Sequence, residues 1–385
     1  MRGIDAKMAD PHVVVVGSGV VGAGAAYELA RAGVRVTIVE ADHAGRATAA
    51  GAGIIAPGTS VRAPKAYERL SYAAAADYPR LIASLADDGQ DTRWYEVCGA
   101  LFVAADEAEA RRLDAVQVAF EERLAAGAPN MGAVTRLDGA GARALFPPLA
   151  EVPAALHVRD AARLDGRSLR SALLAAATGR GARLVHGEAL PVRRGARVTG
   201  VSVGGERLSA DGVILAGGAW SESFARAAGA GASGVYPQRG QILHVDFPVA
   251  DTSSWPVLVG FHSPYMVAFP PHRLVAGATR EDQPGDDPRV TAAGMREVLA
   301  ELLRLAPGAG DATLIEFRVG LRPASRDQLP VIGPAPGVEG LILATGHGAN
   351  GLTAGAYSGR IAARLALGEA APIDLSPYAP GRFGP

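Results

Sequence analysis

Three glycines and one glutamate have the spacing of a site for a dinucleotide. Gly17, Gly19 and Gly22 form the pattern G-x-G-x-x-G directly after the β-branched run 13–16. The first glycine permits a tight turn, the second lets the backbone approach a pyrophosphate, and the third lets a helix pack closely on a sheet. Glu40 follows about 20 residues later, where a carboxylate accepts hydrogen bonds from ribose hydroxyls. This acid disfavours a cofactor with a 2′-phosphate, but the motif alone leaves NAD and FAD open.

The elements around these glycines are those that such a site requires. Residues 13–16 read as a buried strand, residues 23–32 as a helix that Gly33 ends, and residues 34–39 as a second strand. The start of the helix offers free N–H groups and a positive dipole end to a phosphate. Because 49 of the 385 residues are glycine, a turn that binds nothing is the alternative. The strand, helix and terminal acid together favour the binding site.

Composition excludes several classes of function. The net charge of −1 provides no field for nucleic acid or an anionic membrane. The single cysteine, Cys98, excludes an intrachain disulfide and a multi-cysteine metal cluster, so we expect no metal. No apolar run has the length of a membrane span, and the first twelve residues lack the apolar core of a secretory signal. We therefore expect a cytoplasmic enzyme, and leave a homo-oligomer open.

The remaining chain contains two kinds of sequence pattern, one of alternating helices and strands and one of successive strands. Hydrophobic periodicity predicts helices at residues 64–87, 106–126, 166–179, 289–305 and 352–367. Strands are expected at 96–104, 182–186, 212–218, 314–321 and 340–346, and a hairpin at 197–203 and 206–210. Residues 236–277 alternate apolar runs with turns, which indicates an antiparallel sheet. Residues 41–60 show no regular element, but their small side chains would allow close approach to a ligand.

Four segments, in order, resemble the D-amino acid oxidase family, which includes glycine oxidase, D-amino acid dehydrogenase and sarcosine oxidase. They are VVVVGSGVVGAGAAYELARAGVRVTIVE, TAAGAGIIAP, GLRPASRDQLPVIG (residues 320–333) and ATGHGANG (residues 344–351). The resemblance implies noncovalently bound FAD, because no cysteine lies near the C-terminal segment where some sarcosine oxidases attach their flavin. It also implies an α/β fold, in which a Rossmann-like FAD-binding domain carries an inserted antiparallel-sheet α+β substrate domain.

The expected FAD-binding domain is discontinuous, with residues 1–60, 155–232 and 325–385. The expected substrate domain combines residues 61–154 and 233–324. The residues expected to bind the cofactor come from both ends of the chain and from its middle. They are Gly17, Gly19, Val20, Val21, Gly22, Glu40, Ala41, Thr48, Ala50, Gly51, Gly217, Trp220, Arg322, Gly346, Gly348, Ala349, Asn350, Gly351, Leu352 and Thr353.

The same resemblance implies the substrate site. Arg322 in GLRP matches the arginine that binds the substrate carboxylate, and a guanidinium holds a carboxylate with two parallel hydrogen bonds. Tyr265 matches a tyrosine of glycine oxidase that contacts the substrate; its alternative role is that of a core aromatic residue. Gly51, His347 and Ala349 are expected to line the pocket, with His347 packed against the flavin rather than acting as a base. Glycine oxidases carry an arginine where Ala349 stands, so we expect a substrate bulkier than glycine.

The resemblance thus implies FAD-dependent oxidation of the C–N bond of a D-amino acid or related amine carboxylate. The imine product hydrolyses to a 2-oxo acid, and oxygen takes the electrons to give hydrogen peroxide. Such a reaction needs orientation and the cofactor's electronics rather than a strong base. The alternatives are a D-amino acid dehydrogenase with a quinone-linked acceptor, a sarcosine-type secondary-amine oxidase, a nicotinamide dehydrogenase, and a flavin-binding protein without turnover.

Overall fold

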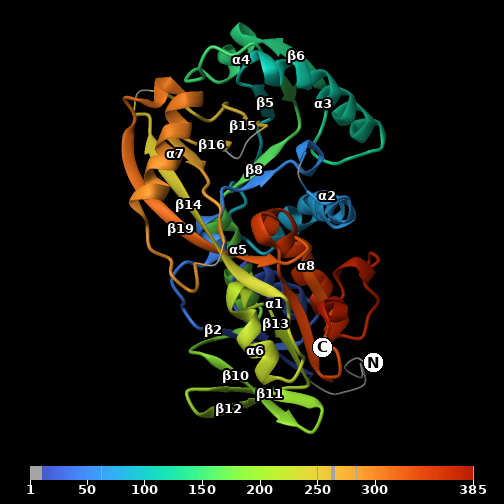
Figure 1. Ribbon diagram of the computed structural model, residues 1–385. Coiled ribbons are helices and arrows are strands. Elements are labelled where there is room, and N and C mark those ends of the chain that lie inside the picture. Colours follow the sequence, from blue (N-terminus) through green and yellow to red (C-terminus); the bar gives the residue numbers. More distant parts are fainter. Residues whose placement is uncertain (1–10, 62, 249, 262–264, 283, 385) are drawn as a thin grey trace.

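Two large β-sheets divide most of the strands of the chain, and helices cover both (Figure 1). The computed structural model describes residues 11–61, 63–248, 250–261, 265–282 and 284–384. The first ten residues, on which the expected absence of a secretory signal rests, lie outside the described residues. Among the described helices, none combines the length and the apolar character that a membrane crossing requires.

The first sheet has six strands in the order β20-β21-β13-β1-β2-β9, all parallel except β20. It is built from three separate parts of the chain. Its strands are β1 (His12–Val16), β2 (Arg35–Glu40), β9 (Arg183–His186), β13 (Gly212–Leu215), β20 (Val331–Pro334) and β21 (Leu341–Thr345).

Alternation along β1 explains how this sheet is covered on both faces. Val13 and Val15 belong to one hydrophobic cluster with the helices α1, α5 and α8, whereas Val14 belongs to another with α6 and a small sheet. A strand buried on both faces is typically a run of β-branched residues, as residues 13–16 of β1 are. The helices are α1 (Val20–Arg31), α2 (Lys65–Asp87), α5 (Gly166–Gly179), α6 (Ser221–Ala227) and α8 (Gly351–Ala366).

The small sheet consists of β10 (Ala189–Arg194), β11 (Arg197–Val203) and β12 (Glu206–Ser209). The predicted hairpin of the last two strands is confirmed, and β10, which the sequence did not predict, pairs with β11 on its other side. A second small sheet contains β3 (Ile54–Ile55), β8 (Ala162–Leu164) and β4 (Tyr95–Val97).

The second large sheet has nine strands, in the order β18-β14-β17-β16-β15-β5-β7-β6, and β19 pairs with β14. It is mixed rather than purely antiparallel, because β15 runs parallel to β5. Helices α3 (Glu107–Ala125), α4 (Gly139–Leu145) and α7 (Ala292–Leu305) accompany it. Its strands are β5 (Ala100–Ala104), β6 (Val134–Asp138), β7 (Ala154–Val158), β14 (Val235–Asp246), β15 (Val257–Gly260), β16 (Tyr265–Phe269), β17 (Arg273–Gly277), β18 (Glu281–Asp282) and β19 (Thr313–Ser325).

Three expectations from the sequence need correction. The strand expected at 96–104 is two strands, β4 and β5, separated by Cys98 and Gly99. Gly99 has φ +78°, and a Cβ there would lie 2.8 Å from His157 Nε2. The segment 41–60 contains a 3₁₀ turn at Ala47–Ala50 as well as β3. The domain boundary expected at residue 155 falls inside β7, which pairs with β5 and β6 in the nine-stranded sheet.

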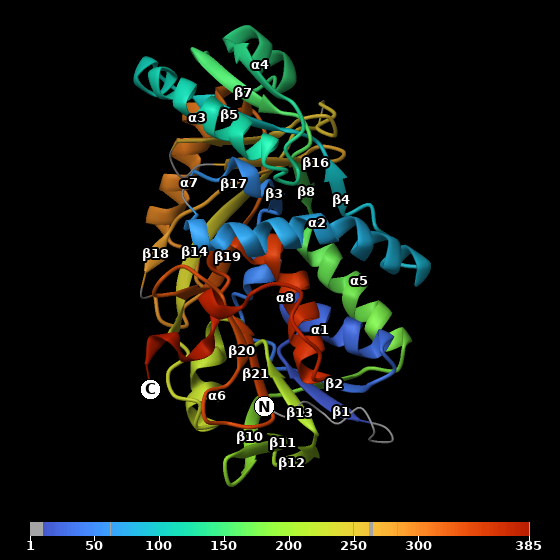
Figure 2. The ribbon, with the colours of Figure 1, turned by 90° about the vertical axis from the view of Figure 1, so that its right-hand side faces the viewer.

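Strands β14 and β19 are the longest pair in the nine-stranded sheet and reach down to the six-stranded one (Figures 1 and 2). Near its C-terminal end, β19 meets the small-residue segment: Leu321 N donates to Gly45 O at 2.8 Å. A Cβ on Gly320 would lie only 3.0 Å from Ala50 Cβ, so the glycine permits this close approach. The strand that carries Arg322 is thereby placed against residues 45–50.

Candidate active site

A cavity of about 950 Å³ extends between the two large sheets. Most of the residues that the sequence predicts for the site line it. They are Gly17, Gly19, Val20, Val21, Glu40, Ala41, Thr48, Ala50, Gly51, Gly217, Trp220, Tyr265, Arg322, His347, Gly348, Ala349, Asn350, Gly351, Leu352 and Thr353.

Gly22 and Gly346 do not line the cavity. Gly22 lies inside the turn, where a Cβ would come within 1.9 Å of Gly17 O. Gly346 has φ +78° and its Cβ would meet Val331 at 3.2 Å. Both glycines therefore shape the chain around the site, and neither faces the cavity itself.

The turn between β1 and α1 has the form of a phosphate cradle. Gly17 has φ +96°, and a Cβ there would lie 2.4 Å from Ala216 O. Gly19 precedes α1 and provides no side-chain cap. Thr48 Oγ1 accepts from Val20 N at 3.1 Å, so the small-residue segment is held against the start of the helix. The first turn of α1 contains no acidic residue, so the positive end of the helix faces the cavity without a carboxylate on the helix itself.

The Glu40 carboxylate is almost fully buried and already holds several partners. It accepts from the backbone N–H groups of Ser18 at 3.2 Å and Asp42 at 3.0 Å, and from the Ser18 hydroxyl. Arg170 and Arg46 approach it at 3.5 and 3.8 Å. Burial lowers the pKa of the Arg170 guanidinium. The sequence did not predict either arginine, because they come from α5 and from the loop after β2 and belong to no motif.

An aromatic pair lines the cavity near this end. The rings of His43 and Trp220 stack with centroids 4.5 Å apart and an interplanar angle of 18°. His43 Nε2 also lies 3.1 Å from the carboxylate of Glu188. Trp220 was predicted, but His43 was not, because a lone histidine after the acidic residue has no distinguishing sequence signal.

The other half of the cavity is built around the start of α8. Asn350, the residue before this helix, makes no side-chain cap, so the helix presents its first N–H groups. Tyr67 Oη donates to Asn350 O at 3.3 Å, and Tyr78 Oη donates to Leu352 O. Two tyrosines of α2 therefore fix the position of the turn.

His347 presents an unpaired polar atom to this region. Its Nε2 lies 2.8 Å from Ser358 Oγ, whereas its buried Nδ1 has no partner among the described residues. Burial lowers the pKa of His347 to about 4. A neutral ring with one unpaired nitrogen is suited to packing against a polar, planar ligand and not to acting as a general base near neutral pH.

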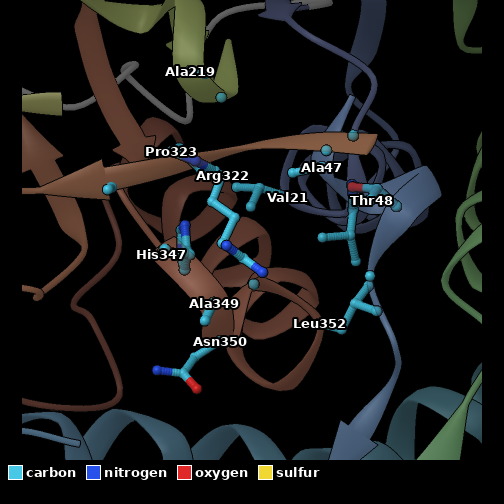
Figure 3. Close-up of a pocket in the computed structure, with 18 of the residues that line it drawn as sticks. Val21, Ala47, Thr48, Ala219, Arg322, Pro323, His347, Ala349, Asn350 and Leu352 are labelled. Atoms are coloured by element: carbon cyan, nitrogen blue, oxygen red, sulfur yellow. The ribbon is translucent and has the colours of Figure 1, made fainter. Parts of the chain in front are cut away.

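Arg322 extends from β19 into the space between His347 and Ala349 on one side and Thr48 and Leu352 on the other (Figure 3). Its Nη1 donates to Thr279 O at 3.0 Å, and also contacts Arg239 O at 3.5 Å. Burial is the main cause that lowers its pKa, and the positive charge of Arg280 adds to the effect. The guanidinium is therefore held in position by backbone oxygens, with no carboxylate of the described residues bound to it.

Tyr265, the second predicted substrate residue, lies on β16 and lines the same cavity. Burial raises the pKa of its hydroxyl, and the nearby Arg322 opposes that rise. The structure thus brings the two predicted substrate residues to one end of the cavity, with the glycine turn and Glu40 at the other.

The residues present fit a flavin dinucleotide. The glycine cradle and the two uncapped helix starts suit a pyrophosphate and an electron-rich ring, and the unpaired His347 Nδ1 lies where a polar ring would pack. A comparison with known families matches residues 12–365 to the FAD dependent oxidoreductase family DAO. The chain belongs to this family.

Relatives and solved structures agree with this assignment. The chain is 40% identical to the uncharacterized oxidoreductase YurR of Bacillus subtilis, over 95% of this chain and 98% of the relative. It is 34% identical to a glycine oxidase of Pseudomonas aeruginosa, over 96% and 98%. Its fold matches iminodiacetate oxidase (IdaA) from Chelativorans sp. BNC1 with a TM-score of 0.90, at 39% identity over 96% of this chain and 98% of that one.

These findings confirm three predictions: the family, the fold of a Rossmann-like domain with a sheet-rich second domain, and FAD as the cofactor. The protein is an FAD-dependent oxidoreductase of the DAO family. Gly17, Gly19, Glu40 and the segment 47–51 would hold the nucleotide half of the cofactor, and residues 347–353 would meet its ring.

Proposed function

We propose that this enzyme oxidises the C–N bond of an amine carboxylate bulkier than glycine, either a D-amino acid or an N-substituted glycine. The observation that carries the proposal is the Arg322 guanidinium, which is directed into the cavity with Ala349 beside it (Figure 3). A carboxylate held by this fork would place the substrate's Cα–N bond over the cofactor end. Two of the three named relatives support this class, because glycine and iminodiacetate are amines that carry carboxylates.

Bound FAD supplies the acceptor for the two electrons of this oxidation. The chain's own residues orient the substrate: Arg322 fixes the carboxylate, Tyr265 borders the site, and the small side chain of Ala349 leaves room for a substituent. The amine loses a hydride from Cα and a proton from nitrogen, and water hydrolyses the resulting imine to an oxo acid and an amine or ammonia. His347, with its pKa lowered to about 4, is neutral and is not required to take the proton. We propose oxygen as the final electron acceptor, which yields hydrogen peroxide.

A secondary-amine oxidase is the variant of this proposal that Ala349 favours. A substituent on the substrate nitrogen needs space beside the carboxylate, and an alanine provides more of it than an arginine. A D-amino acid dehydrogenase would use the same binding residues and differ only in its reaction with oxygen.

The test is an anaerobic titration of the FAD-loaded enzyme, followed by its visible spectrum. The panel comprises D-amino acids, N-methylated amino acids and glycine. We expect at least one bulkier amine carboxylate to bleach the flavin faster than glycine, and air to restore the colour with formation of peroxide. Bleaching without reoxidation by air would replace oxygen by a quinone-linked acceptor. A flavin that no amine carboxylate bleaches would contradict the proposed reaction and favour a flavin-binding protein without turnover.

A further inference from the structure

The turn between β19 and β20 holds one residue in an uncommon backbone conformation. Gln328 has φ +62°, in the left-handed region that residues other than glycine rarely adopt. It lines the cavity, and its side-chain amide makes no hydrogen bond with another described residue. Residues in such conformations cluster at ligand sites, where the surrounding structure holds them in place. The backbone of Gln328 therefore points to a contact with a bound ligand.

Hydrogen bonds within the turn fix this conformation. Gln328 N donates to Ser325 O at 3.1 Å, and Ser325 Oγ donates to Leu329 O at 2.6 Å. The Asp327 carboxylate accepts from Leu329 N at 3.1 Å. The residues on both sides of Gln328 are thus tied to one another, so its backbone has little freedom to leave the left-handed region.

An arginine from the C-terminal end of the chain clamps the same turn. Arg382 Nε and Nη2 donate to the two carboxylate oxygens of Asp327 at 2.7 and 3.0 Å. Its Nη2 also donates to Leu329 O at 2.7 Å, so one guanidinium holds both neighbours of Gln328. Arg382 does not line the cavity itself. Its effect on a bound ligand would therefore pass through the turn.

The C-terminal segment has other anchors besides this arginine. Tyr378 is fully buried, and its Oη donates to Ala66 O at 2.6 Å. Phe383 packs against the start of β14, where a Cβ on Gly234 would lie 2.4 Å from its ring. Removal of the Arg382 side chain should therefore release the turn and leave the segment attached.

The turn lies at the end of the cavity where the cofactor ring is expected. The first residue of β20, Val331, pairs with Thr345, two residues before His347. Residues 347–353 are those that we expect to meet the ring. A carboxamide offers donor N–H groups beside an acceptor oxygen. The pyrimidine edge of a flavin offers the complementary pair, a carbonyl oxygen beside an N–H group.

We propose that Gln328 hydrogen-bonds the pyrimidine edge of the bound flavin, and that Arg382 is the positioning residue that holds Gln328 there. The amide N–H group donates to a ring oxygen that gains negative charge on reduction, so it stabilises the reduced ring more than the oxidised one. The contact depends on the FAD of this family and not on the proposed substrate.

The first test measures the FAD affinity and the midpoint potential of the flavin without substrate. Gln328→Gly removes the amide and suits the positive φ, so the variant should fold as well as the wild type. We expect its Kd for FAD to rise about fivefold, because one neutral hydrogen bond is lost. The midpoint potential should fall by about 30 mV, which is a tenfold weaker preference for the reduced flavin. Gln328→Glu keeps the size, replaces the donor by a negative charge, and should lower the potential further.

The second test asks whether Arg382 acts through Gln328. Arg382→Ala should shift both quantities in the same direction by a smaller amount. Added to Gln328→Gly, it should shift them no further. Arg382→Lys should restore part of the effect, because it keeps the charge and loses the fork. The matched control is Arg364→Ala, which should change neither quantity: Arg364 binds Glu369 at 3.3 Å and Ala370 O at 3.0 Å, outside the cavity.

Each outcome decides one part of the proposal. Unchanged FAD affinity and potential in Gln328→Gly would overturn the contact with the flavin. A change confined to the KM of a substrate would overturn it as well, and would assign Gln328 to the substrate. A further shift in the double variant would remove Arg382 from its positioning role. The affinity and the potential need no substrate, so they decide the proposal even if no amine carboxylate is oxidised and the proposed function fails.

Discussion

Among the residues that the structure describes, backbone oxygens and not acidic side chains accept hydrogen bonds from the Arg322 guanidinium. The carbonyl of Thr279 accepts from Nη1 at 3.0 Å, and Nη2 lies over Gly240. A cation held in this way keeps its full charge for a ligand, whereas an ion pair would have to be broken first.

We therefore expect Arg322→Ala to raise KM for amine carboxylates at least about tenfold, since a charged hydrogen bond is lost. The flavin should stay bound, and the visible spectrum of the FAD-loaded variant without substrate should be that of an oxidised flavoprotein. Steady-state kinetics of the FAD-loaded variant provide the measurement. Arg194→Ala is the matched control, because that arginine is exposed on β10 and does not line the cavity. An unchanged KM in Arg322→Ala would remove this residue from the substrate site.

Individual residues could be predicted from the sequence only where a motif contains them. Arg322 lies in GLRP, and Gly17 and Glu40 lie in the glycine fingerprint, so each has a recognisable context. Arg170 and Arg280 have none. The first contacts Glu40 from α5, and the second enters the cavity only because β18 pairs with β14. Their roles depend on tertiary packing, which local patterns do not contain.

At the scale of the element, the turn between β1 and α1 depends on its first glycine. Gly17 has φ +96°, and a Cβ added to it would lie 2.4 Å from Ala216 O, so an alanine there would be strained and would also clash. Gly33, at the end of α1, has φ +76° but open space around it. Alanine variants at these two positions therefore distinguish the effect of backbone strain, which both share, from the effect of a clash in the phosphate cradle, which only Gly17→Ala has.

We expect Gly17→Ala to purify with little or no flavin, and to regain little when FAD is added. Gly33→Ala should lose about 1 kcal/mol of stability from the positive φ and keep its flavin. The ratio of flavin absorbance to protein absorbance measures occupancy, and urea unfolding measures stability. Equal flavin content in the two variants would contradict the assigned role of Gly17.

Elements with strong periodicity were predicted well, and irregular ones were not. Helices α2, α3 and α5 lie within one residue of their expected bounds, because their apolar stripes are long. The expected strand 96–104 breaks at Gly99, where the chain lies against His157. This contact joins residues distant in the sequence, so the local pattern around Gly99 does not predict it. Strand β10 was missed because Leu190 is exposed and Pro191 interrupts the run, so it lacks the alternation of a half-buried strand.

At the scale of the whole molecule, two buried histidines tie stability to pH. His244 on β14 is 2% exposed, and neither ring nitrogen has a partner among the described residues. Burial lowers its pKa to about 3, and Arg318 of β19, Arg273 of β17 and Arg167 of α5 add to the effect, while Glu316 opposes it. His347 has its pKa lowered to about 4 by burial. Both rings are neutral in the folded protein at neutral pH.

The sign of the pH effect follows from these directions. Below the ordinary histidine pKa of 6.5, the unfolded chain binds protons that the folded protein does not. The contribution of these histidines to the unfolding free energy is therefore fully present above about pH 6.5. It is lost as the pH falls towards their pKa values in the folded protein. From pH 7 to pH 5, each histidine should cost about 2 kcal/mol of unfolding free energy.

Between pH 7 and pH 5, the unfolding free energy of His244→Leu should fall by about 2 kcal/mol less than that of the wild type. At pH 7 the variant should be at least as stable, since it removes two unpaired buried nitrogens and has a similar volume. Urea unfolding of the FAD-loaded proteins at both pH values provides the comparison. The same loss in both proteins would show that His244 does not contribute to the pH dependence.

The long-range architecture was predicted in outline. The change of texture at residue 236 indicated a second sheet, and the return of a strand–glycine–helix unit at residues 340–367 indicated a discontinuous nucleotide domain. The parallel pairing of β5 with β15 was not predictable, because it joins residues about 150 positions apart whose local sequences resemble any buried strand.

The hydrogen bond from Leu321 N to Gly45 O couples the position of β19 to the binding of the cofactor. The strand that carries Arg322, the proposed carboxylate anchor, rests on residues 45–50, which we expect to lie against the cofactor. During maturation, we expect that segment to settle when FAD loads, and the anchor to reach its working position only afterwards. In cells short of riboflavin, the cofactor-free protein would then accumulate without binding the substrate.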